Sequence, residues 1–273
     1  MCKRATVLFL LLFLLLFILT MPPIAGTMAE SNVSQTNTGK TTVIATSSED
    51  VTGDGVKDGI ILIGTRAYGD NLVFFTNINV RIIDSANNRV IDAGISGLAG
   101  YDPKLFIGDF TGDKIKDIMI SAPTGGSGGI IDNRIVSVSG GIPKVIFEEK
   151  DNSGLAITGK FVDGFKADIK VEQLGMEFTI DLQAFKDMYI EGGTYSKDGK
   201  LLIDVEPWID PFSTLDPVDY DGDGTYCLHG YQSISGVAHV NRISNVESIW
   251  KYSDGRWVIE NAEYSTCMIS DGM

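Results

Sequence analysis

The sequence contains very little histidine, and this scarcity limits its chemistry. Only His229 and His239 occur among 273 residues. Zinc and other borderline-soft metals are held mainly by imidazole and thiolate ligands. The other candidate ligands in this chain are hard oxygen atoms, so we expect no zinc site. His229 follows an acidic loop closely, and we interpret it as a surface or strand residue.

Positive charge is also scarce. The chain has 22 Lys and Arg residues against 36 Asp and Glu residues, which gives a net charge of −14. Loss of Lys3 and Arg4 with a leader segment removes two positive charges and makes the net charge −16. Such a negative field repels nucleic acids and anionic membrane surfaces. We therefore expect neither of them as a partner.

Long apolar runs are missing except near the N-terminus. A basic Lys3-Arg4 start precedes a Leu/Phe-rich run at residues 7–19, and Pro22-Pro23 end it. This order is typical of a secretory signal peptide. We assign the signal peptide to residues 1–29, with cleavage after Ala29.

An uncleaved membrane anchor is the alternative interpretation of the same segment. Residues 5–21 provide 17 apolar-leaning positions, which is near the lower limit for crossing a bilayer. With cleavage, we expect an exported, soluble monomer that is secreted, extracellular or associated with the cell surface. It would then meet the membrane only transiently, through its signal peptide.

Cysteine is rare as well. After removal of the leader, Cys227 and Cys267 remain. In an oxidising compartment such a pair can form a disulfide. The other interpretation is two buried thiols in neighbouring strands, and the sequence does not decide between them.

Long helical periodicity is missing from the mature sequence. Residues 30–40 are polar and lack aromatic side chains, which predicts a flexible spacer. From Thr41 onward, short apolar–polar alternations such as residues 77–82 and 167–171 are separated by Gly, Asn and Asp turns. Alternation with a period of two is typical of strands. We predict an all-β domain over residues 41–273.

Three similar acidic loops are the most informative feature that is present. Residues 50–58 (DVTGDGVKD) and 109–117 (DFTGDKIKD) each run into an apolar, strand-like segment. Residues 219–227 (DYDGDGTYC) begin in the same way and end differently. Oxygen ligands at alternating loop positions suit Ca²⁺. An EF-hand is excluded because position 12 carries no acid, so we predict strand–loop–strand calcium sites.

The predicted calcium ligands occupy equivalent positions in each loop. Positions 1, 3, 5 and 9 offer side-chain oxygens, and position 7 offers its backbone carbonyl. The ligands are Asp50, Thr52, Asp54, Val56 and Asp58 in the first loop, Asp109, Thr111, Asp113, Ile115 and Asp117 in the second, and Asp219, Asp221, Asp223 and Thr225 in the third. Because Cys227 replaces the acid at position 9, we expect two well-formed sites and one weaker site.

The spacing of the loops indicates a repeat. They begin at residues 50, 109 and 219, which fits a unit of about 55 to 60 residues, with one unit that has lost its loop. A unit of this length accommodates a four-stranded antiparallel sheet, and radial repetition of such sheets gives a β-propeller. We predict a propeller-like array of four-stranded blades, closed by pairing of residues 41–46 with residues 248–259. A β-sandwich with coincidental acidic turns is the alternative.

The loops and the strands after them resemble the FG-GAP/VCBS-type repeats of integrin-like β-propellers. The resemblance rests on DVTGDGVKDGIILI from Asp50 and IGDFTGDKIKDIMISA from Ile107. The later PVDYDGDG makes the whole order similar to secreted VCBS-repeat proteins of Gram-positive bacteria. The resemblance implies a propeller with calcium in its blade loops, and no catalytic activity comes with it. Cys227 departs from the pattern at the third loop.

One glycine-rich segment formally matches a serine nucleophile motif. Residues 125–129 read GGSGG, which fits G-x-S-x-G. That elbow requires a strand before it and a helix after it. Residues 130–136 predict a strand instead, so we interpret the segment as a glycine turn and assign no catalytic residue.

Two functions remain open. We expect a non-catalytic, calcium-stabilised module that binds or adheres to a surface protein or a glycan. Exposed aromatic residues on one rim would favour sugar, and Trp208, Tyr220, Tyr226 and Tyr231 are the candidates, although they can also be core residues. The alternative is a secreted hydrolase or lyase that acts on polysaccharide and contains structural calcium.

Overall fold

The computed structural model of the chain describes residues 39–67 and 73–266. The predicted signal peptide (1–29) and residues 30–38 of the predicted spacer lie outside the described residues, and so does Cys267. Gly39 and Lys40, at the end of the spacer, have no regular secondary structure. No helix within the described ranges is long and apolar enough to cross a membrane.

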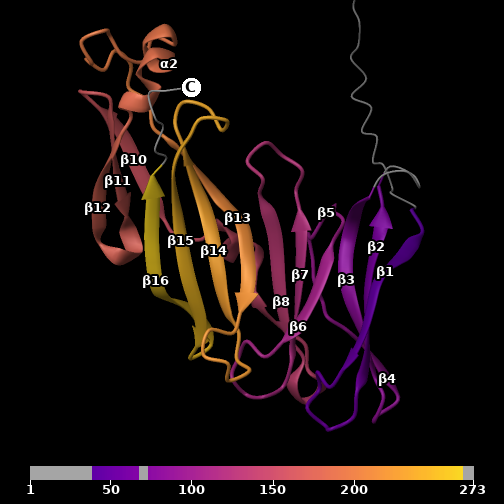
Figure 1. Cartoon of the computed structure of the whole chain (residues 1–273). Coiled ribbons are helices and arrows are strands. Elements are labelled where there is room, and N and C mark those ends of the chain that lie inside the picture. Colours follow the sequence, from indigo (N-terminus) through magenta and orange to yellow (C-terminus); the bar gives the residue numbers. More distant parts are fainter. Residues whose placement is uncertain (1–38, 68–72, 267–273) are drawn as a thin grey trace, which may run out of the picture. The chain divides into compact units, whose positions relative to one another are not determined.

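The described chain forms four antiparallel sheets, which confirms the all-β prediction (Figure 1). Sheet 1 contains β1 (Thr41–Glu49), β2 (Asp58–Arg66), β3 (Phe74–Asp84), β4 (Arg89–Asp92) and β5 (Gly100–Tyr101). Sheet 2 contains β6 (Lys104–Gly108), β7 (Asp117–Pro123), β8 (Ile131–Ser137) and β9 (Lys144–Phe147). Sheet 3 contains β10 (Ile157–Val162), β11 (Lys166–Val171) and β12 (Met176–Asp181). Sheet 4 contains β13 (Trp208–Val218), β14 (Cys227–Ser235), β15 (Arg242–Ser253) and β16 (Arg256–Thr266).

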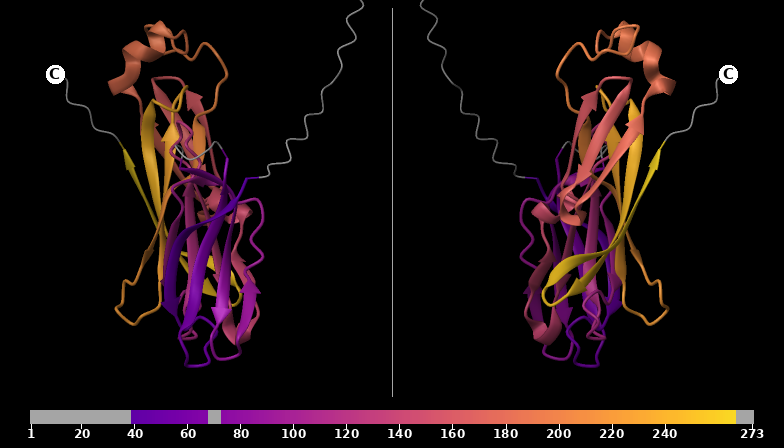
Figure 2. Two further views of the ribbon diagram at one scale, coloured as in Figure 1. Left: turned by 90° about the vertical axis from the view of Figure 1, so that its right-hand side faces the viewer. Right: turned by 90° about the vertical axis from the view of Figure 1, so that its left-hand side faces the viewer.

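The helices of the described chain are short and lie in connections. They are the 3₁₀ turns η1 (Ser139–Gly141), η2 (Glu149–Ser153), η3 (Glu172–Leu174) and η4 (Gln183–Phe185), and the α-helix α2 (Lys186–Glu191). Helix α2 lies at the end of the sheets opposite to the acidic loops (Figure 2). The regular part of the molecule is therefore built almost entirely from strands.

Alternation of apolar and polar residues determines which side of each strand is buried. On β11, Ala167, Ile169 and Val171 are buried, whereas Lys166 and Lys170 are exposed. This period of two is the pattern of a strand with one covered face. Both alternating segments cited from the sequence, 77–82 and 167–171, are confirmed as strands, in β3 and β11.

Three apolar cores show which sheets are neighbours. One core is shared by sheets 1 and 2, one by sheets 2 and 4, and one by sheets 3 and 4. Representative members, in that order, are Leu62 and Ile120, Met119 and Leu228, and Ile169 and Ile234. Sheet 3 follows sheet 2 in the sequence but packs on sheet 4, so it does not separate sheets 2 and 4.

The predicted closure between residues 41–46 and 248–259 is wrong. Among the described strands, β1 pairs only with β2, and β16 pairs only with β15. Strand β1 pairs with β2 across one short acidic loop. This pairing is favoured because closing a short loop costs less entropy than pairing distant segments. The repeat is also less regular than predicted, because sheet 3, which stands where the unit without a loop was expected, has three strands.

Sheet 4 buries one face and leaves the other open. On β14, Leu228 and Ile234 enter the cores shared with sheets 2 and 3, and Gln232 between them is fully buried. The intervening residues point to the opposite face of a strand. His229 and Tyr231 accordingly line a pocket on that open face.

Gln232 anchors the connection between sheets 2 and 3 to sheet 4. Its Oε1 accepts a hydrogen bond from Leu155 N (2.7 Å), and its Nε2 donates to the carbonyls of Ser153 (2.9 Å) and Asp210 (3.2 Å). Gly154 lies so close that a Cβ added there would overlap Gln232 Oε1. Both ends of the Gln232 amide are therefore used in a buried site.

Gln232→Ala should lower the free energy of unfolding by about 2 to 4 kcal/mol, because it leaves a buried N–H and buried carbonyls without partners. Urea unfolding measures the change. Gln173→Ala is the matched control, since Gln173 Oε1 also accepts a backbone hydrogen bond (Ala156 N, 2.8 Å) but at an exposed site. Its loss should stay below about 1 kcal/mol. Equal losses in the two variants would contradict the anchoring role of Gln232.

Candidate functional site

The three acidic loops occupy the same place in three sheets (Figure 1). Each joins the first strand of its sheet to the second: residues 50–57 join β1 to β2, residues 109–116 join β6 to β7, and residues 219–226 join β13 to β14. The ninth loop position is the first residue of the second strand every time. The predicted strand–loop–strand arrangement is confirmed.

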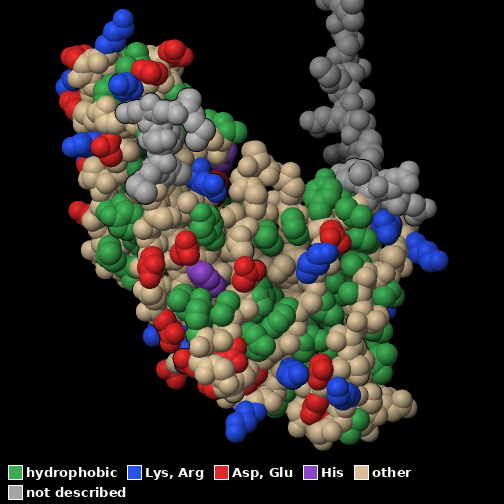
Figure 3. Space-filling model, viewed as in Figure 1, with side chains coloured by type: hydrophobic (Ala, Val, Ile, Leu, Met, Phe, Trp, Pro, Cys, Tyr) green, Lys and Arg blue, Asp and Glu red, His purple; other side chains and the backbone are tan. Residues whose placement is uncertain are grey.

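The loops also touch one another. Asp109 and Thr225 form a parallel bridge, next to which Tyr226 N donates to Asp109 O (2.7 Å). A Cβ added to Gly53 would overlap the side chain of Ile115. The loops therefore follow one another along one end of sheets 1, 2 and 4. Acidic side chains gather there at the ends of β13 and β14 (Figure 3).

The aspartate at position 1 shapes each loop by binding the loop's own backbone. Asp50 Oδ1 accepts a hydrogen bond from Gly53 N (2.7 Å), and Asp50 Oδ2 accepts one from Gly55 N (2.8 Å). Asp109 and Asp219 accept the same two bonds, from the amides at the fourth and sixth positions of their loops. This carboxylate is thus an internal cap that curls the loop.

The carboxylates at position 5 accept fewer hydrogen bonds from the loop backbone than those at position 1. Asp54, Asp113 and Asp223 each accept one hydrogen bond on Oδ1, at 2.9, 2.8 and 2.7 Å, from the amide two residues later. The donors are the residues at position 7, which are Val56, Ile115 and Thr225. All three aspartates are exposed, as is Asp221 at position 3 of the third loop. These carboxylates have oxygens available for a cation.

The aspartates at position 9 point inward. Asp58 Oδ2 accepts hydrogen bonds from Val51 N and Thr52 N, both at 3.1 Å. Asp117 Oδ2 accepts one from Phe110 N (2.9 Å), and both aspartates are fully buried. Burial raises the pKa of Asp117 to about 6, and the nearby carboxylates of the same loop add to this increase.

The donor chemistry of the first two loops fits a hard cation, although their carboxylates do not converge. In the part of the chain that the structure describes, no three side chains among His, Cys, Asp and Glu are arranged to hold a metal. Two buried oxygens at predicted ligand positions, Thr52 Oγ1 and Asp117 Oδ1, have no hydrogen-bond partner among the described residues. An unpartnered buried oxygen is costly, and a bound cation would satisfy it.

The third loop differs at its ninth position. Cys227 is buried there, and burial raises the pKa of its thiol. A protonated thiol is a poor ligand for a hard cation. The third loop therefore remains a predicted site of weaker calcium binding. Cys267 lies outside the described residues, so its disulfide with Cys227 also stays a prediction.

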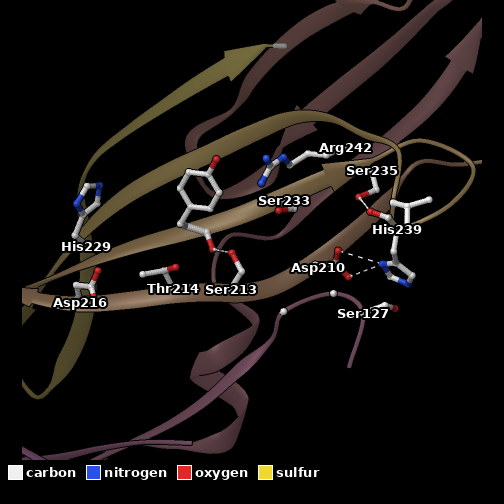
Figure 4. Close-up of a pocket in the computed structure, with 14 residues that line it drawn as sticks. Ser127, Asp210, Ser213, Thr214, Asp216, His229, Ser233, Ser235, His239 and Arg242 are labelled. Carbon is white, nitrogen blue, oxygen red and sulfur yellow. Dashed lines mark hydrogen bonds and ion pairs between the residues drawn. The ribbon is translucent and has the colours of Figure 1, made fainter. Parts of the chain in front are cut away.

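A polar pocket of about 640 Å³ lies on the open face of sheet 4 (Figure 4). Its walls come from β13, β14, the loop between β14 and β15, the start of β15 and the turn between β7 and β8. Polar groups in the lining include Asp210, Ser213, Asp216, His229, Ser233 and Arg242. None of the predicted calcium ligands contributes to it, so the pocket is a second and separate candidate site.

Two irregularities in β13 change which side chains reach this pocket. The register between β13 and β14 shifts between Ile209 and Phe212, and again between Phe212 and Thr214. Each shift inserts an extra residue into β13, and such bulges re-aim side chains. Asp210 lies in the first shift and Ser213 in the second, and both line the pocket. A strict period of two in the sequence does not reveal them.

The two histidines belong to this pocket. His239 Nδ1 lies 3.2 Å from the carboxylate of Asp210, which is only 5% exposed. The ring of Trp208 packs on the His239 imidazole with 4.8 Å between centroids. Further along the pocket, His229 Nε2 lies 3.3 Å from Glu247 Oε2. His229 is a strand residue as predicted, but the sequence did not join the two histidines in one site.

The four aromatic candidates divide between core and surface. Tyr226 packs against Phe106 (5.0 Å between centroids) at the core shared by sheets 2 and 4. Trp208 is 52% exposed and begins β13, so it lies at the far end of that strand from the third loop. Tyr231 lines the pocket, and Tyr220, 49% exposed, contacts His229. Only Tyr231 therefore lines the pocket, whereas Trp208 and Tyr220 contact its two histidines.

Asp117 makes the stability of the fold depend on pH. Its pKa of about 6 in the folded state exceeds the ordinary 3.8, so the folded state binds this proton more tightly than the unfolded chain. As pH rises from about 4 to about 6, ionisation should therefore remove up to roughly 3 kcal/mol of stability. Asp117→Asn stays neutral, so its stability relative to the wild type should grow by that amount between pH 4 and pH 7.

Urea unfolding in chelator at pH 4, 5.5 and 7 measures this difference. Asp204→Asn, at an exposed position, controls for the loss of one negative charge and should show no comparable trend. If the free energies of unfolding of Asp117→Asn and the wild type differ by the same amount at every pH, burial does not raise the pKa of Asp117.

The C-terminal part of the chain matches a protein family. Residues 155–265 match the YybI C-terminal domain. This range contains sheet 3 and nearly all of sheet 4, which share one core. Over 230 residues the chain is 31% identical to the uncharacterized protein YybI of Bacillus subtilis (strain 168), which covers 84% of this chain and 86% of that protein. No solved structure matches the chain.

These matches correct the resemblance to FG-GAP/VCBS repeats, because no such repeat family is found. The resemblance rested on the short acidic loops. Their Asp and Gly residues are required by the internal hydrogen bonds of the loop, so this pattern does not by itself identify a family. Identity over most of both chains is the stronger criterion, and the chain belongs to the YybI family.

Proposed function

We propose that this protein is an exported, monomeric module that binds a glycan in the pocket on the open face of sheet 4. The observation that carries the proposal is the combination of a polar pocket of about 640 Å³ with the exposed indole of Trp208 at its His239 end. Small-molecule sites join a few convergent polar groups to aromatic surfaces. A sugar offers hydroxyls to the polar groups and an apolar ring face to the indole.

A protein partner receives less support from the same surface. Stable protein interfaces bury about 800 Å² on each side around aromatic or arginine anchors. The lining here is concave and, beside Tyr231 and Arg242, consists mainly of hydroxyl, carboxylate and imidazole groups such as those of Ser213, Asp216 and His229. These groups suit the many hydroxyls of a saccharide better than an apolar side chain.

We also propose that calcium binds the first two acidic loops and stiffens the scaffold. In this proposal sheets 1, 2 and 4 form an open, propeller-like array, and sheet 3 packs on sheet 4. Contact between adjacent acidic loops supports it, since neighbouring carboxylates repel one another unless a cation lies between them. With a Kd of about 10⁻⁴ to 10⁻³ M, each site would add about 0.4 to 1.4 kcal/mol at millimolar calcium.

Trp208→Ala should weaken glycan binding at least about tenfold, which corresponds to roughly 1.4 kcal/mol. A panel of immobilised bacterial and plant polysaccharides identifies the ligand for the wild type, and calorimetry with soluble oligosaccharide then compares the variants. Tyr264→Ala is the matched control, because Tyr264 is 48% exposed on the same sheet but stacks on Phe178 and not on His239. Absence of any polysaccharide binding, or equal weakening by both substitutions, would contradict the proposal.

Calcium at about 1 mM should raise the melting temperature above that in chelator, and the double variant Asp54→Asn, Asp113→Asn should lose most of this increase. Asparagine keeps the single backbone hydrogen bond that each aspartate accepts but removes its charge. In chelator the variant should therefore melt no lower than the wild type, because its loops repel each other less. Asp221→Asn in the third loop should change the calcium effect less. A calcium effect that survives the double substitution would refute these two sites.

A further inference from the structure

The glycine-rich turn at residues 125–129 lies beside the Asp210–His239 pair (Figure 4). The turn is closed by hydrogen bonds from Gly129 N to Gly126 O (3.1 Å) and from Thr124 N to Ile130 O (2.9 Å). Strand β8 follows it, as the sequence predicts, so the turn is not a strand–helix elbow. It reaches the pocket from sheet 2, whereas Asp210 and His239 belong to sheet 4 and the loop after β14.

The turn approaches Asp210 closely because Gly128 has no side chain. A Cβ added there would lie 3.3 Å from Asp210 Oδ1, tighter than ordinary contact. Ser127 comes directly before Gly128 and lines the same pocket. Figure 4 shows Ser127, His239 and Asp210 at the same end of the pocket, and of these three only Asp210 and His239 are joined by dashed lines. The glycine thus lets the turn bring Ser127 into the pocket that is also lined by the carboxylate-bound His239.

Asp210 orients the imidazole for proton transfer. Both Asp210 oxygens lie 3.2 Å from His239 Nδ1. A carboxylate only accepts hydrogen bonds, so Nδ1 carries a proton, and in the neutral ring Nε2 is then the nitrogen with the lone pair. The Trp208 ring limits rotation of the imidazole. Nε2 is therefore the ring nitrogen that can act as a base in the pocket.

The loop that carries His239 is held at both ends. Ser235 Oγ donates to His239 O (3.2 Å), and Gly236 N donates to Asn241 O (2.7 Å). The buried Tyr189 hydroxyl donates to Asn241 Oδ1 (2.6 Å). Reactive groups need such support to hold their geometry.

We infer that Ser127 and His239 are catalytic residues, positioned by Asp210, that hydrolyse carboxylic esters, and that the substrates are O-acylated saccharides. The saccharide part rests on the proposed glycan site, whereas the ester chemistry rests on the three side chains alone. This activity belongs to the secreted-hydrolase alternative that the sequence analysis left open, with Ser127 as the nucleophile.

The reaction balances with water as the only co-reactant. Ser127 Oγ attacks the ester carbonyl carbon while its proton passes to His239 Nε2. The bond to the sugar oxygen then breaks, and the sugar hydroxyl leaves with that proton, which gives an acyl-serine. Water attacks the acyl carbon, and His239 Nε2 takes its proton and returns it to Ser127 Oγ. A carboxylic acid leaves and the enzyme is restored.

Ser127 and His239 share no hydrogen bond within normal geometry in the described structure. Such bonds are often long or poorly aligned before substrate binds and tighten in the complex. The test therefore reports on reactivity and not on resting geometry.

The experiment treats the purified full chain with p-nitrophenyl acetate and, separately, with a fluorophosphonate that labels activated serines. We expect hydrolysis above the buffer rate and phosphonylation at Ser127, located by peptide mass spectrometry. Ser127→Ala should abolish the label, and His239→Gln should lower kcat at least about 100-fold. Asp210→Asn should lower kcat with a much smaller change in KM. Ser85→Ala, at an exposed serine far from the pocket, should behave as the wild type.

Melting curves identify any variant that fails to fold, and labelling of the wild-type serine tests the inference without any substitution. Absence of label on Ser127, or hydrolysis unchanged in Ser127→Ala, overturns it. Glycan binding without hydrolysis overturns the ester site and leaves the proposed function standing. Hydrolysis and labelling without glycan binding support the ester site and overturn the saccharide assignment and the proposed function.

Discussion

The two unlike faces of sheet 4 are the constraint on which the rest of the structure depends. One face of β14 must be covered twice, by sheet 2 at Leu228 and by sheet 3 at Ile234, and fully buried Gln232 bonds to the chain that connects those sheets. Because successive side chains of a strand point to opposite faces, His229, Tyr231 and Ser233 lie on the other face. Because both covering sheets share one side, the polar side remains open and forms the pocket.

The acidic loops are best understood as internally capped turns that stand close together. Their first carboxylates bind loop amides, and the ninth carboxylates of the first two loops bind the amides of the second and third positions. The order Asp–x–x–Gly and the buried ninth aspartate therefore have structural reasons that do not depend on a metal. Other features of the loops favour calcium binding. They are the spare oxygens at position 5, the unpartnered Thr52 Oγ1 and Asp117 Oδ1, and the repulsion between adjacent loops.

Local features of the fold could be predicted from the sequence, and long-range ones could not. Period-two segments such as β11 and the strand–loop–strand units follow from residues close in the chain. Sheet 3 packs on sheet 4 through contacts such as Ile169 with the Ile234 core, which no local pattern records. The pocket was missed for the same reason: Ser127, Asp210 and His239 are far apart in sequence, and Asp210 reaches the pocket through a bulge. The two scarce histidines were the available signal.

Those histidines also provide the most direct test of the central claim, that the open face of sheet 4 is the ligand site. The whole chain contains only His229 and His239, and both line the pocket. Their imidazole signals can therefore be followed by NMR while an oligosaccharide from the binding polysaccharide is titrated in at fixed pH. The account predicts that both signals shift together and saturate with the binding isotherm. Saturable binding that leaves both imidazole signals unchanged would contradict it.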